Sequence, residues 1–422
     1  MLARLLALLL LVMAGPALAD TIVIHAGHLI TDAAQPARGP STIVVVDGRI
    51  QSVTAGLNPA PQGARLIDLS SRTILPGLID AHVHLTSAPG GAWWREAIDT
   101  DEYAALLGAH NALVTLRAGF TTVRDLGSSG VAGFALKRAI DEGLVPGPRM
   151  LVSGPPLSTI GGHGDVAGFR PEVIAALDGH NTCTGADQCA ARVRELARAG
   201  ADVIKFMATG GVLSQGDRQL GQAFTDAEMR AIVETAHGLG LKVAAHAHAD
   251  EGIAAAVRAG VDSIEHGTFA SPATIQLMRQ RGTTLVPTLM AFVGIRERLG
   301  TGVYTPLVES KVRMTLEVVG RAARLAHDAG VPVVFGTDAA VYPHGRNAGE
   351  FAQLVRYAGM TPAQAIAAAT TGAAHLLGLD SEVGRIAPGL SADLIAVDGD
   401  PLTDVTRLEH VEFVMVRGRA LE

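Results

Sequence analysis

Apolar residues recur along the middle of the chain in a repeating order: a helix-like stretch, a glycine, and then a short apolar run. Strand-like runs follow within about three residues of Gly119, Gly200, Gly240, Gly260, Gly282 and Gly330. Glycine in this position is typical of a left-handed helix C-cap, and short links are typical of helix-to-strand turns. With two further strand-like runs near residues 73–84 and 150–154, the pattern predicts eight strands.

The helical stretches between these strands have clear boundaries. Residues 225–240 begin with Thr225, a good N-cap residue, carry apolar residues at helical spacing, and end at Gly240. Eight strand-and-helix units over roughly 300 residues are typical of a closed parallel barrel, whereas an open doubly wound sheet usually has fewer strands. We therefore predict an α/β fold with a (β/α)8 TIM-type barrel over residues 73–380.

The two ends of the chain have a different pattern. Residues 21–69 and 384–422 contain short apolar runs joined by turn sequences such as Asp47-Gly48 and Asp398-Gly399. Such runs are typical of antiparallel strands. Because the termini of a domain often lie close together, we predict one small β-sandwich built from both ends, over residues 20–72 and 381–422.

The first nineteen residues have the features of a secretory signal peptide. Arg4 precedes the apolar run Leu5–Met13, and Ala17 and Ala19 are small residues of the kind that signal peptidase reads. We expect cleavage before Asp20 and a periplasmic or secreted protein. The alternative is an uncleaved anchor. The apolar run is shorter than the roughly 20 residues of a membrane span, so we expect no stable membrane anchor after cleavage.

Charge and cysteine content narrow the function further. The chain of 422 residues has a formal net charge of −7 and no basic face, so we expect no nucleic-acid partner. Cys183 and Cys189 lie in a short polar stretch, where a local disulfide is expected in an oxidising compartment and free thiols are the alternative. Their separation is wider than the usual spacing of about two to four residues between paired zinc cysteines.

Several predicted strands end in side chains that could bind a metal. His82 and His84 are two positions apart, so a strand places both imidazoles on one face, about 6.6 Å apart along the chain. Alone, this pair could equally be two hydrogen-bonded histidines. Other predicted strands end in Lys205, His246, His248, His266 and Asp338. The carboxyl ends of barrel strands form one rim, where barrel enzymes build their active sites.

Lys205 is unusual because it lies in the middle of the apolar run 203–207. Burial of an unpaired ammonium costs on the order of several kcal/mol and lowers its pKa, so part of the amine becomes neutral and nucleophilic. A neutral amine can capture carbon dioxide, and the resulting carbamate has two oxygens with which to bridge two divalent ions. The alternative is an ion pair with a nearby carboxylate such as Asp125.

These strand-end residues, with the segments 79–84, 265–267 and 384–399, resemble the amidohydrolase superfamily. Within it the chain is most similar to the prolidase-like branch that includes ochratoxin-hydrolysing enzymes, with imidazolonepropionase-like relatives. The resemblance covers nearly the whole chain after the leader. It implies two zinc ions, an N6-carboxylated lysine and amide hydrolysis by a hydroxide that bridges the metals. By position, one metal would be bound by His82, His84 and Asp338, the other by His246 and His266, with Lys205 as the bridge.

The resemblance also implies roles in catalysis. Asp338 would take a proton from the attacking water and pass it to the leaving nitrogen, His163 would hydrogen-bond the scissile carbonyl, and His248 would contact the substrate. Arg95 and Arg346 are candidates for binding a substrate carboxylate. We expect a small-molecule amide or dipeptide substrate, cleaved next to a free carboxylate, and a homo-oligomeric enzyme.

Two other functions stay open. His248 could replace His246 as a ligand, with Glu251 as a proton shuttle, as in one-metal cyclic-amide hydrolases and deaminases. Lys205 argues against this alternative, because those enzymes often have no bridging lysine. A barrel that has lost catalysis and serves as a periplasmic binding protein is the third possibility. The complete set of ligand residues argues against it.

Overall fold

The computed structural model describes residues 21–90, 93–177, 179–215 and 220–421. The expected signal peptide, residues 1–19, lies outside the described residues. Among the helices that are described, none has both the length and the apolar character needed to cross a membrane.

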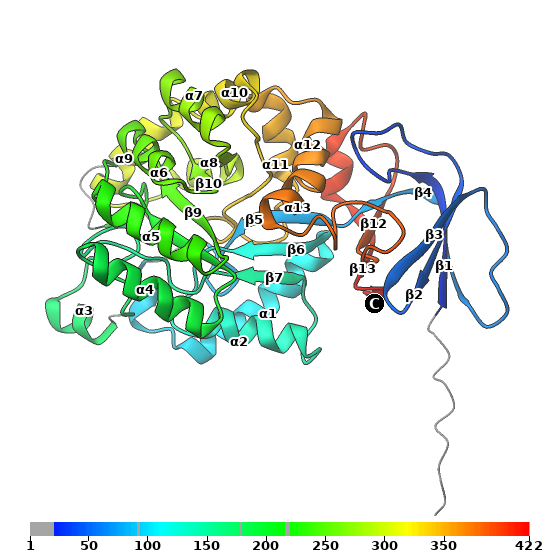
Figure 1. Ribbon diagram of the computed structural model, residues 1–422, viewed down its shortest axis with the longest axis horizontal. Helices are drawn as coiled ribbons and strands as arrows, with labels where there is room; N and C mark the ends of the chain where they lie inside the picture. Colours follow the sequence, from blue (N-terminus) through cyan, green and yellow to red (C-terminus); the bar gives the residue numbers. More distant parts are fainter. Residues whose placement is uncertain (1–20, 91–92, 178, 216–219, 422) are drawn as a thin grey trace, which may run out of the picture.

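Parallel strands form the barrel that the sequence predicts (Figure 1). Strands β5, β6 and β7 pair in that order, and β8, β9, β10 and β11 form a second parallel group. Their bounds are β5 (Leu78–Val83), β6 (Phe120–Asp125), β7 (Arg149–Val152), β8 (Val203–Met207), β9 (Lys242–Ala247), β10 (Ser263–His266) and β11 (Thr284–Val286).

Irregular segments close the barrel between these two groups. On one side, Leu157 forms a parallel bridge with Phe206 of β8. On the other side, residues 333–339 take the place of the eighth strand: Val333 bridges to β11 and Ala339 bridges to β5. This segment is not a regular strand, and near its end Asp338 adopts a left-handed backbone conformation with φ of 58°. The predicted barrel is therefore present, with an irregular eighth position.

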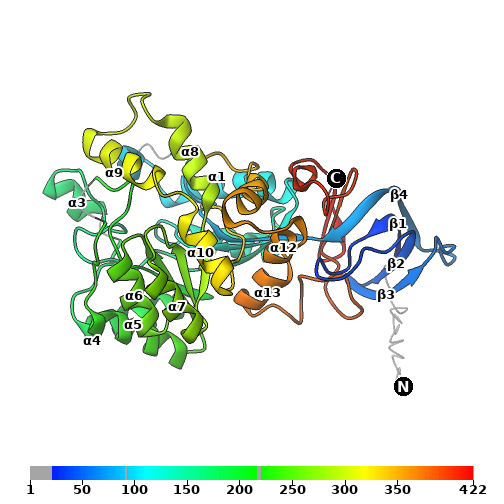
Figure 2. The same cartoon turned by 90° about the horizontal axis from the view of Figure 1, so that it is seen from above.

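Helices cover the outside of the barrel, and the terminal strands lie to one side of it in both views (Figures 1 and 2). The long and short helices are α1 (Asp101–Arg117), α2 (Ala132–Asp141), α3 (Pro171–Leu177), α4 (Ala186–Ala199), α5 (Asp226–Gly238), α6 (Asp250–Ala259), α7 (Pro272–Arg281), α8 (Leu289–Arg298), α9 (Pro306–Leu316), α10 (Arg321–Ala329), α11 (Gly349–Gln353), α12 (Pro362–Ala368) and α13 (Thr371–Leu377). Short turns of helix are η1 (Trp93–Ala97), η2 (Leu354–Ala358) and η3 (Val405–Glu409).

The helix ends are those that the sequence predicts. Thr225 caps α5, and its side chain and that of Glu228 form a capping box. Gly200 and Gly260 follow α4 and α6 with φ of 103° and 99°, in the left-handed conformation that glycine adopts without steric cost. Each cap turns the chain directly into the next barrel strand.

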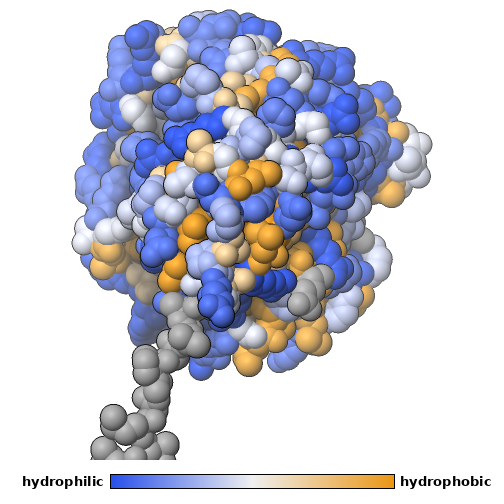
Figure 3. Space-filling view, turned by 90° about the vertical axis from the view of Figure 1, so that its right-hand side faces the viewer, coloured by the Kyte–Doolittle hydropathy of each residue, from blue (hydrophilic) through white to orange (hydrophobic). Residues whose placement is uncertain are grey.

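Strands from both ends of the chain form one seven-stranded sheet. In spatial order its members are β14 (Arg419–Ala420), β13 (Val411–Val416), β12 (Leu394–Val397), β4 (Arg65–Pro76), β1 (Thr21–Leu29), β2 (Ser41–Val46) and β3 (Arg49–Ala55). Buried Ile24 and Ile43 from the amino-terminal strands share one core with Leu394 and Met415 from the carboxyl-terminal strands. Figure 3 views this end of the molecule, where apolar side chains lie among polar ones on the surface.

Two details of this sheet differ from the expectation. The pairing is antiparallel except between β1 and β4, which run parallel because residues 56–64 carry the chain from one edge back across to β1. In addition, the expected strand over residues 73–84 is two strands. Pro76 pairs with Leu394 in the terminal sheet, whereas Leu78 pairs with Phe120 in the barrel. Gly77 lies between them, where an added Cβ would lie 2.1 Å from the Thr121 hydroxyl.

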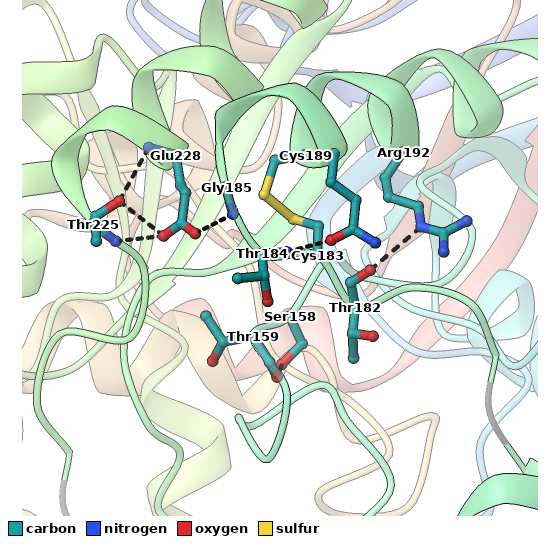
Figure 4. The surroundings of a disulfide bond; sticks show 11 residues. Ser158, Thr159, Thr182, Cys183, Thr184, Gly185, Cys189, Arg192, Thr225 and Glu228 are labelled. Carbon is teal, nitrogen blue, oxygen red and sulfur yellow. Dashed lines mark hydrogen bonds between the residues drawn. A yellow bond between two sulfur atoms is a disulfide. The ribbon is translucent and has the colours of Figure 1, made fainter.

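The expected disulfide between Cys183 and Cys189 is present, at the start of α4 (Figure 4). Both cysteines are buried. The enclosed turn is also bound to α5, because the Gly185 N–H donates to the Glu228 carboxylate at 2.7 Å. The disulfide therefore fixes a turn that connects two neighbouring helices.

Replacing both cysteines by serine is expected to lower the free energy of unfolding by about 2 kcal/mol, the loop-closure value for a short ring. Urea denaturation of the wild type and the double variant would measure the difference. A reductant should lower the midpoint of the wild type but leave that of the double variant unchanged. Equal midpoints for the two proteins without reductant would contradict a stabilising disulfide.

Candidate active site

The polar strand-end residues meet at one rim of the barrel. Two groups of three side chains have ligand atoms that all lie within 4.8 Å of one another. The first group is His82, His84 and Asp338, and the second is His246, His248 and His266. The groups adjoin, because the rings of His82 and His266 have centroids 5.2 Å apart.

The first group is organised around Asp338. Its Oδ1 lies 3.2 Å from His84 Nε2 and 3.5 Å from His82 Nε2. The Asp338 backbone N–H donates to the His82 carbonyl at 2.8 Å, which fixes the eighth segment beside β5. Burial alone would raise the pKa of Asp338, but the neighbouring His82 and His84 bring it well below its usual value. The carboxylate is therefore charged and available as a metal ligand.

The second group consists of buried imidazoles. The ring centroid of His246 lies 4.6 Å from that of His248 and 4.7 Å from that of His266. Threonine hydroxyls fix two of the rings: His248 Nδ1 lies 2.8 Å from Thr268 Oγ1, and His266 Nδ1 lies 2.6 Å from Thr288 Oγ1. The structure thus places His248 with the candidate ligands, so the choice between His246 and His248 stays open.

Four of the five histidines are held in their neutral form, whereas the pKa of His84 is raised, because its contact with Asp338 outweighs the effect of burial. Burial and the charge of Lys205 lower the pKa of His82 to about 4. Burial and the nearby His163 lower the pKa of His248 to about 3, and burial takes those of His246 and His266 well below their usual range. A neutral imidazole has the lone pair that a metal ligand needs.

Lys205 is buried near both groups and is 1% exposed. Its charge lowers the pKa of His82 in the first group and of His246 in the second, so the amine is close to both. Burial lowers the pKa of Lys205 itself to about 8, although Glu265 and Asp338 act in the opposite direction. Among the described residues, no carboxylate oxygen is within 4.0 Å of this amine.

Asp125, the alternative partner of Lys205, forms hydrogen bonds with backbone N–H groups. Its carboxylate accepts backbone hydrogen bonds from Leu85 at 2.8 Å and from Gly127 at 3.3 Å. Burial raises the pKa of Asp125 to about 6. In the described part of the chain, Asp125 therefore positions the backbone that follows β5 and does not form an ion pair with Lys205.

A buried carboxylate, that of Glu265, contacts the first group through His82. Glu265 Oε2 lies 2.8 Å from His82 Nδ1, and Glu265 Oε1 accepts from Arg124 Nη2 at 2.9 Å and from the Ser263 hydroxyl at 2.5 Å. Burial alone would raise the pKa of Glu265, but Arg124 and His82 lower it to about 2. The carboxylate fixes the orientation of His82 and leaves its Nε2 facing the site. Sequence reasoning missed this arrangement, although a charged Arg124 inside the apolar strand β6 was a signal for it.

Replacing Glu265 by glutamine is expected to weaken metal binding by about 10- to 100-fold, because the partner that orients His82 loses its charge. Competition with a chelator on the folded variant would measure the affinity. Glu297→Gln is the matched control, since Glu297 pairs with Arg346 on the surface and should leave metal binding unchanged. An unchanged affinity in Glu265→Gln would contradict the supporting role.

The remaining candidates have different surroundings. His163 reaches the second group, with its ring centroid 4.3 Å from that of His246. Arg95 is paired with Asp99, and Arg346 with Glu297. Both candidate arginines for a substrate carboxylate are therefore already in ion pairs. Glu251 is exposed at the start of α6.

The sequence matches the model of the amidohydrolase family over residues 73–421. Ochratoxinase from Aspergillus niger is 32% identical over 426 aligned positions, which cover 94% of this chain and 85% of that protein. The chain belongs to the amidohydrolase family. It is therefore a hydrolase that acts on C–N bonds, with the barrel and extra domain of that family.

Two further amidohydrolases help to place the chain. The crystal structure of a Xaa-Pro dipeptidase with bound methionine superimposes with a TM-score of 0.89 at 36% identity, covering 96% of this chain and 100% of that one. Imidazolonepropionase from Chloroflexus aggregans is 26% identical, over 90% of this chain and 92% of that protein. Amidohydrolases generally use metal ions, and within the described part of the chain the two groups around His82 and His246 are sets of residues that could bind them.

Proposed function

We propose that this amidohydrolase is an exported binuclear zinc enzyme that cleaves an amide bond next to a free carboxylate. The substrate class is a dipeptide or an N-acyl amino acid, ochratoxin A included. The observation that carries the proposal is that buried Lys205, which has no carboxylate oxygen within 4.0 Å among the described residues, acts electrostatically on histidines of both groups of candidate metal ligands.

The donor atoms of the site fit zinc. Both groups offer imidazole nitrogens, and the first adds a carboxylate oxygen, which are ordinary zinc ligands. With zinc–nitrogen bonds of about 2.0 to 2.1 Å, two ligand atoms on one ion lie roughly 3 to 4 Å apart. A spread of up to 4.8 Å needs only small side-chain adjustments to reach that geometry.

Lys205 would complete the site after reaction with carbon dioxide. The neutral amine nitrogen forms a bond to the carbon of carbon dioxide and releases one proton, which leaves a carbamate with one negative charge. With a pKa lowered to about 8, Lys205 has a larger neutral fraction at neutral pH than an exposed lysine. The two carbamate oxygens would then face the two ligand groups.

The side chains of this chain would divide the remaining work between them. Two divalent ions, when bound, supply a water of lowered pKa and polarise a carbonyl. Asp338 would accept the proton of that water and deliver it to the leaving nitrogen, for which its low pKa keeps it ionised at the start. His163, beside the second group, would donate a hydrogen bond to the carbonyl oxygen.

The proposed substrate class is supported by two relatives. One is called an ochratoxinase and another a Xaa-Pro dipeptidase, and the latter was crystallised with methionine in its active site. The bond next to proline in a Xaa-Pro dipeptide is an amide adjacent to a free carboxylate. Export is supported by the leader sequence and by the disulfide, which an oxidising compartment maintains.

Metal analysis and a substrate screen test the proposal together. The chain from residue 20 onward, purified with zinc, is expected to contain about two zinc ions and to hydrolyse Xaa-Pro dipeptides or N-acyl amino acids, read by mass spectrometry. Removal of zinc by a chelator should abolish turnover, and added zinc should restore it. A chain that binds one ion, or that cleaves no member of such a panel, would contradict the proposal. Light scattering would test the expected homo-oligomer.

A one-metal cyclic-amide hydrolase is the second candidate. Its support is the likeness to an imidazolonepropionase and the three-histidine group, which could bind one ion by itself. That function predicts one metal per chain and a large loss of activity in Glu251→Gln. The exposed position of Glu251 is unfavourable for a proton shuttle at a buried site.

A further inference from the structure

His163 is held by the loop that follows β8. Its Nδ1 lies 2.5 Å from the hydroxyl of Ser214. On the same edge, an added Cβ at Gly211 would lie 2.2 Å from His163 Nδ1 and 2.4 Å from its Cγ and Cε1. The Nδ1 edge of the ring therefore faces residues 211–214, and Nε2 lies on the other side of the ring.

Gly211 is required for space and not for its backbone conformation. Its φ lies outside the left-handed region, so any residue could adopt the backbone there. A methyl group at this position would overlap the His163 ring. The glycine thus provides a place for the imidazole.

Hydrogen bonds from two other side chains hold the loop of residues 211–214 and the segment that contains His163. Lys311 of α9 donates to the Gly211 carbonyl at 2.7 Å and to the Ser214 carbonyl at 2.9 Å, so the loop is held at both ends. Residues 156–164, which contain His163, are held by Asn181. Its side-chain amide donates to the Pro156 carbonyl at 2.7 Å and to the Gly164 carbonyl at 2.8 Å. The backbone on both sides of the contact between His163 and Ser214 is therefore held by hydrogen bonds from other segments.

We propose that Ser214 is a positioning residue that sets the tautomer of His163. A neutral imidazole donates from one nitrogen and accepts at the other. When the Ser214 hydroxyl donates to Nδ1, the proton of the ring is on Nε2, which can then donate to the carbonyl oxygen of the substrate. The inference rests on the proposed function, because it assigns the donor that amide hydrolysis at this site would use.

Kinetics of single and double variants separate this role from a structural one. Ser214→Ala is expected to lower kcat by about 10- to 100-fold with little change in KM, and Ser214→Thr, which keeps the hydroxyl, should retain most of the activity. In a His163→Asn background, Ser214→Ala should have no further effect. An equal loss in both backgrounds, or no loss in the wild-type background, would overturn the proposal.

Gly211→Ala provides a second test that does not depend on the serine. It should displace the His163 ring and lower kcat to the level of His163→Asn, with the zinc content unchanged. Gly238→Ala in α5 is the matched control, because an added Cβ there has no neighbour within 4 Å and its backbone is not left-handed. Full activity in Gly211→Ala would count against the placement of the ring.

The tautomer can also be read without a substrate. In protein labelled with 15N-histidine, with His163→Asn to assign the signal, the wild type should show the proton of His163 on Nε2. Ser214→Ala should shift the signal towards a mixture of the two tautomers. A wild-type proton on Nδ1 would overturn the proposal. If the Nε2 tautomer is present but no amide is cleaved, the proposed function fails while the role of Ser214 remains.

Discussion

Lys205→Ala is expected to lower kcat/KM by more than about 100-fold, because the loss of a residue that only supports a ligand already costs 10- to 100-fold. The substitution removes the group that would connect the two ligand groups. We expect the zinc content to fall from about two ions per chain to one or fewer. Turnover of a Xaa-Pro dipeptide and metal analysis of the same preparation would measure both effects.

Small carboxylic acids should restore part of the activity of Lys205→Ala. Acetate or propionate can occupy the space of the missing side chain and offer two oxygens in place of the carbamate. Lys137→Ala is the control, since Lys137 forms a partly exposed ion pair with Asp202 on the outside of the barrel. A fully active Lys205→Ala with two zinc ions would exclude a carboxylated lysine from the mechanism.

The barrel was predictable because its signals are local. A helix such as α5 has its cap, its apolar spacing and its terminal signal within one short stretch of sequence, and the next strand follows directly. The repetition of that unit then identified the fold. Helix ends such as Gly200 and Gly260 lie where the sequence places them.

Features that depend on distant pairing were not predictable in the same way. The parallel pairing of β1 with β4 follows from the path of residues 56–64, which periodicity does not specify. The split at Gly77 is a change of pairing partner, from Leu394 in the terminal sheet to Phe120 in the barrel. The eighth barrel position is formed by isolated bridges from Val333 to β11 and from Ala339 to β5, and not by a regular strand. Each of these features is set by contacts between segments far apart in the chain.

The residues of the candidate site also fall into a set that could be predicted from the sequence and a set that could not. His82, His84, His246, His266 and Asp338 could be grouped from the sequence, because the ends of parallel barrel strands converge. The groups that orient them could not. Glu265 and Ser214 are ordinary polar residues in the sequence, and only the fold brings them to the Nδ1 atoms of His82 and His163.

Asp338→Asn is expected to lower kcat by about 10²- to 10⁴-fold, the usual contribution of a general acid–base group. Asparagine keeps a side-chain oxygen that can bind a metal, but it does not accept the proton of the attacking water. Asn also tolerates the left-handed conformation of this position, where φ is 58°, so the backbone should not change. The zinc content should therefore stay close to that of the wild type while turnover is lost.

Comparison with Asp338→Ala separates the two roles of this carboxylate. Alanine removes the oxygen that would bind the metal, so Asp338→Ala should lose zinc as well as activity. Alanine also has no polar side chain that could stabilise the left-handed backbone by a local hydrogen bond. Asp398→Asn, in an exposed pair with Arg72 on the terminal sheet, should leave both properties unchanged. If Asp338→Asn lost as much zinc as Asp338→Ala, its low activity would reflect the metal site. Near wild-type turnover in Asp338→Asn would instead assign the proton transfer to another group, because an amide at this position cannot carry it.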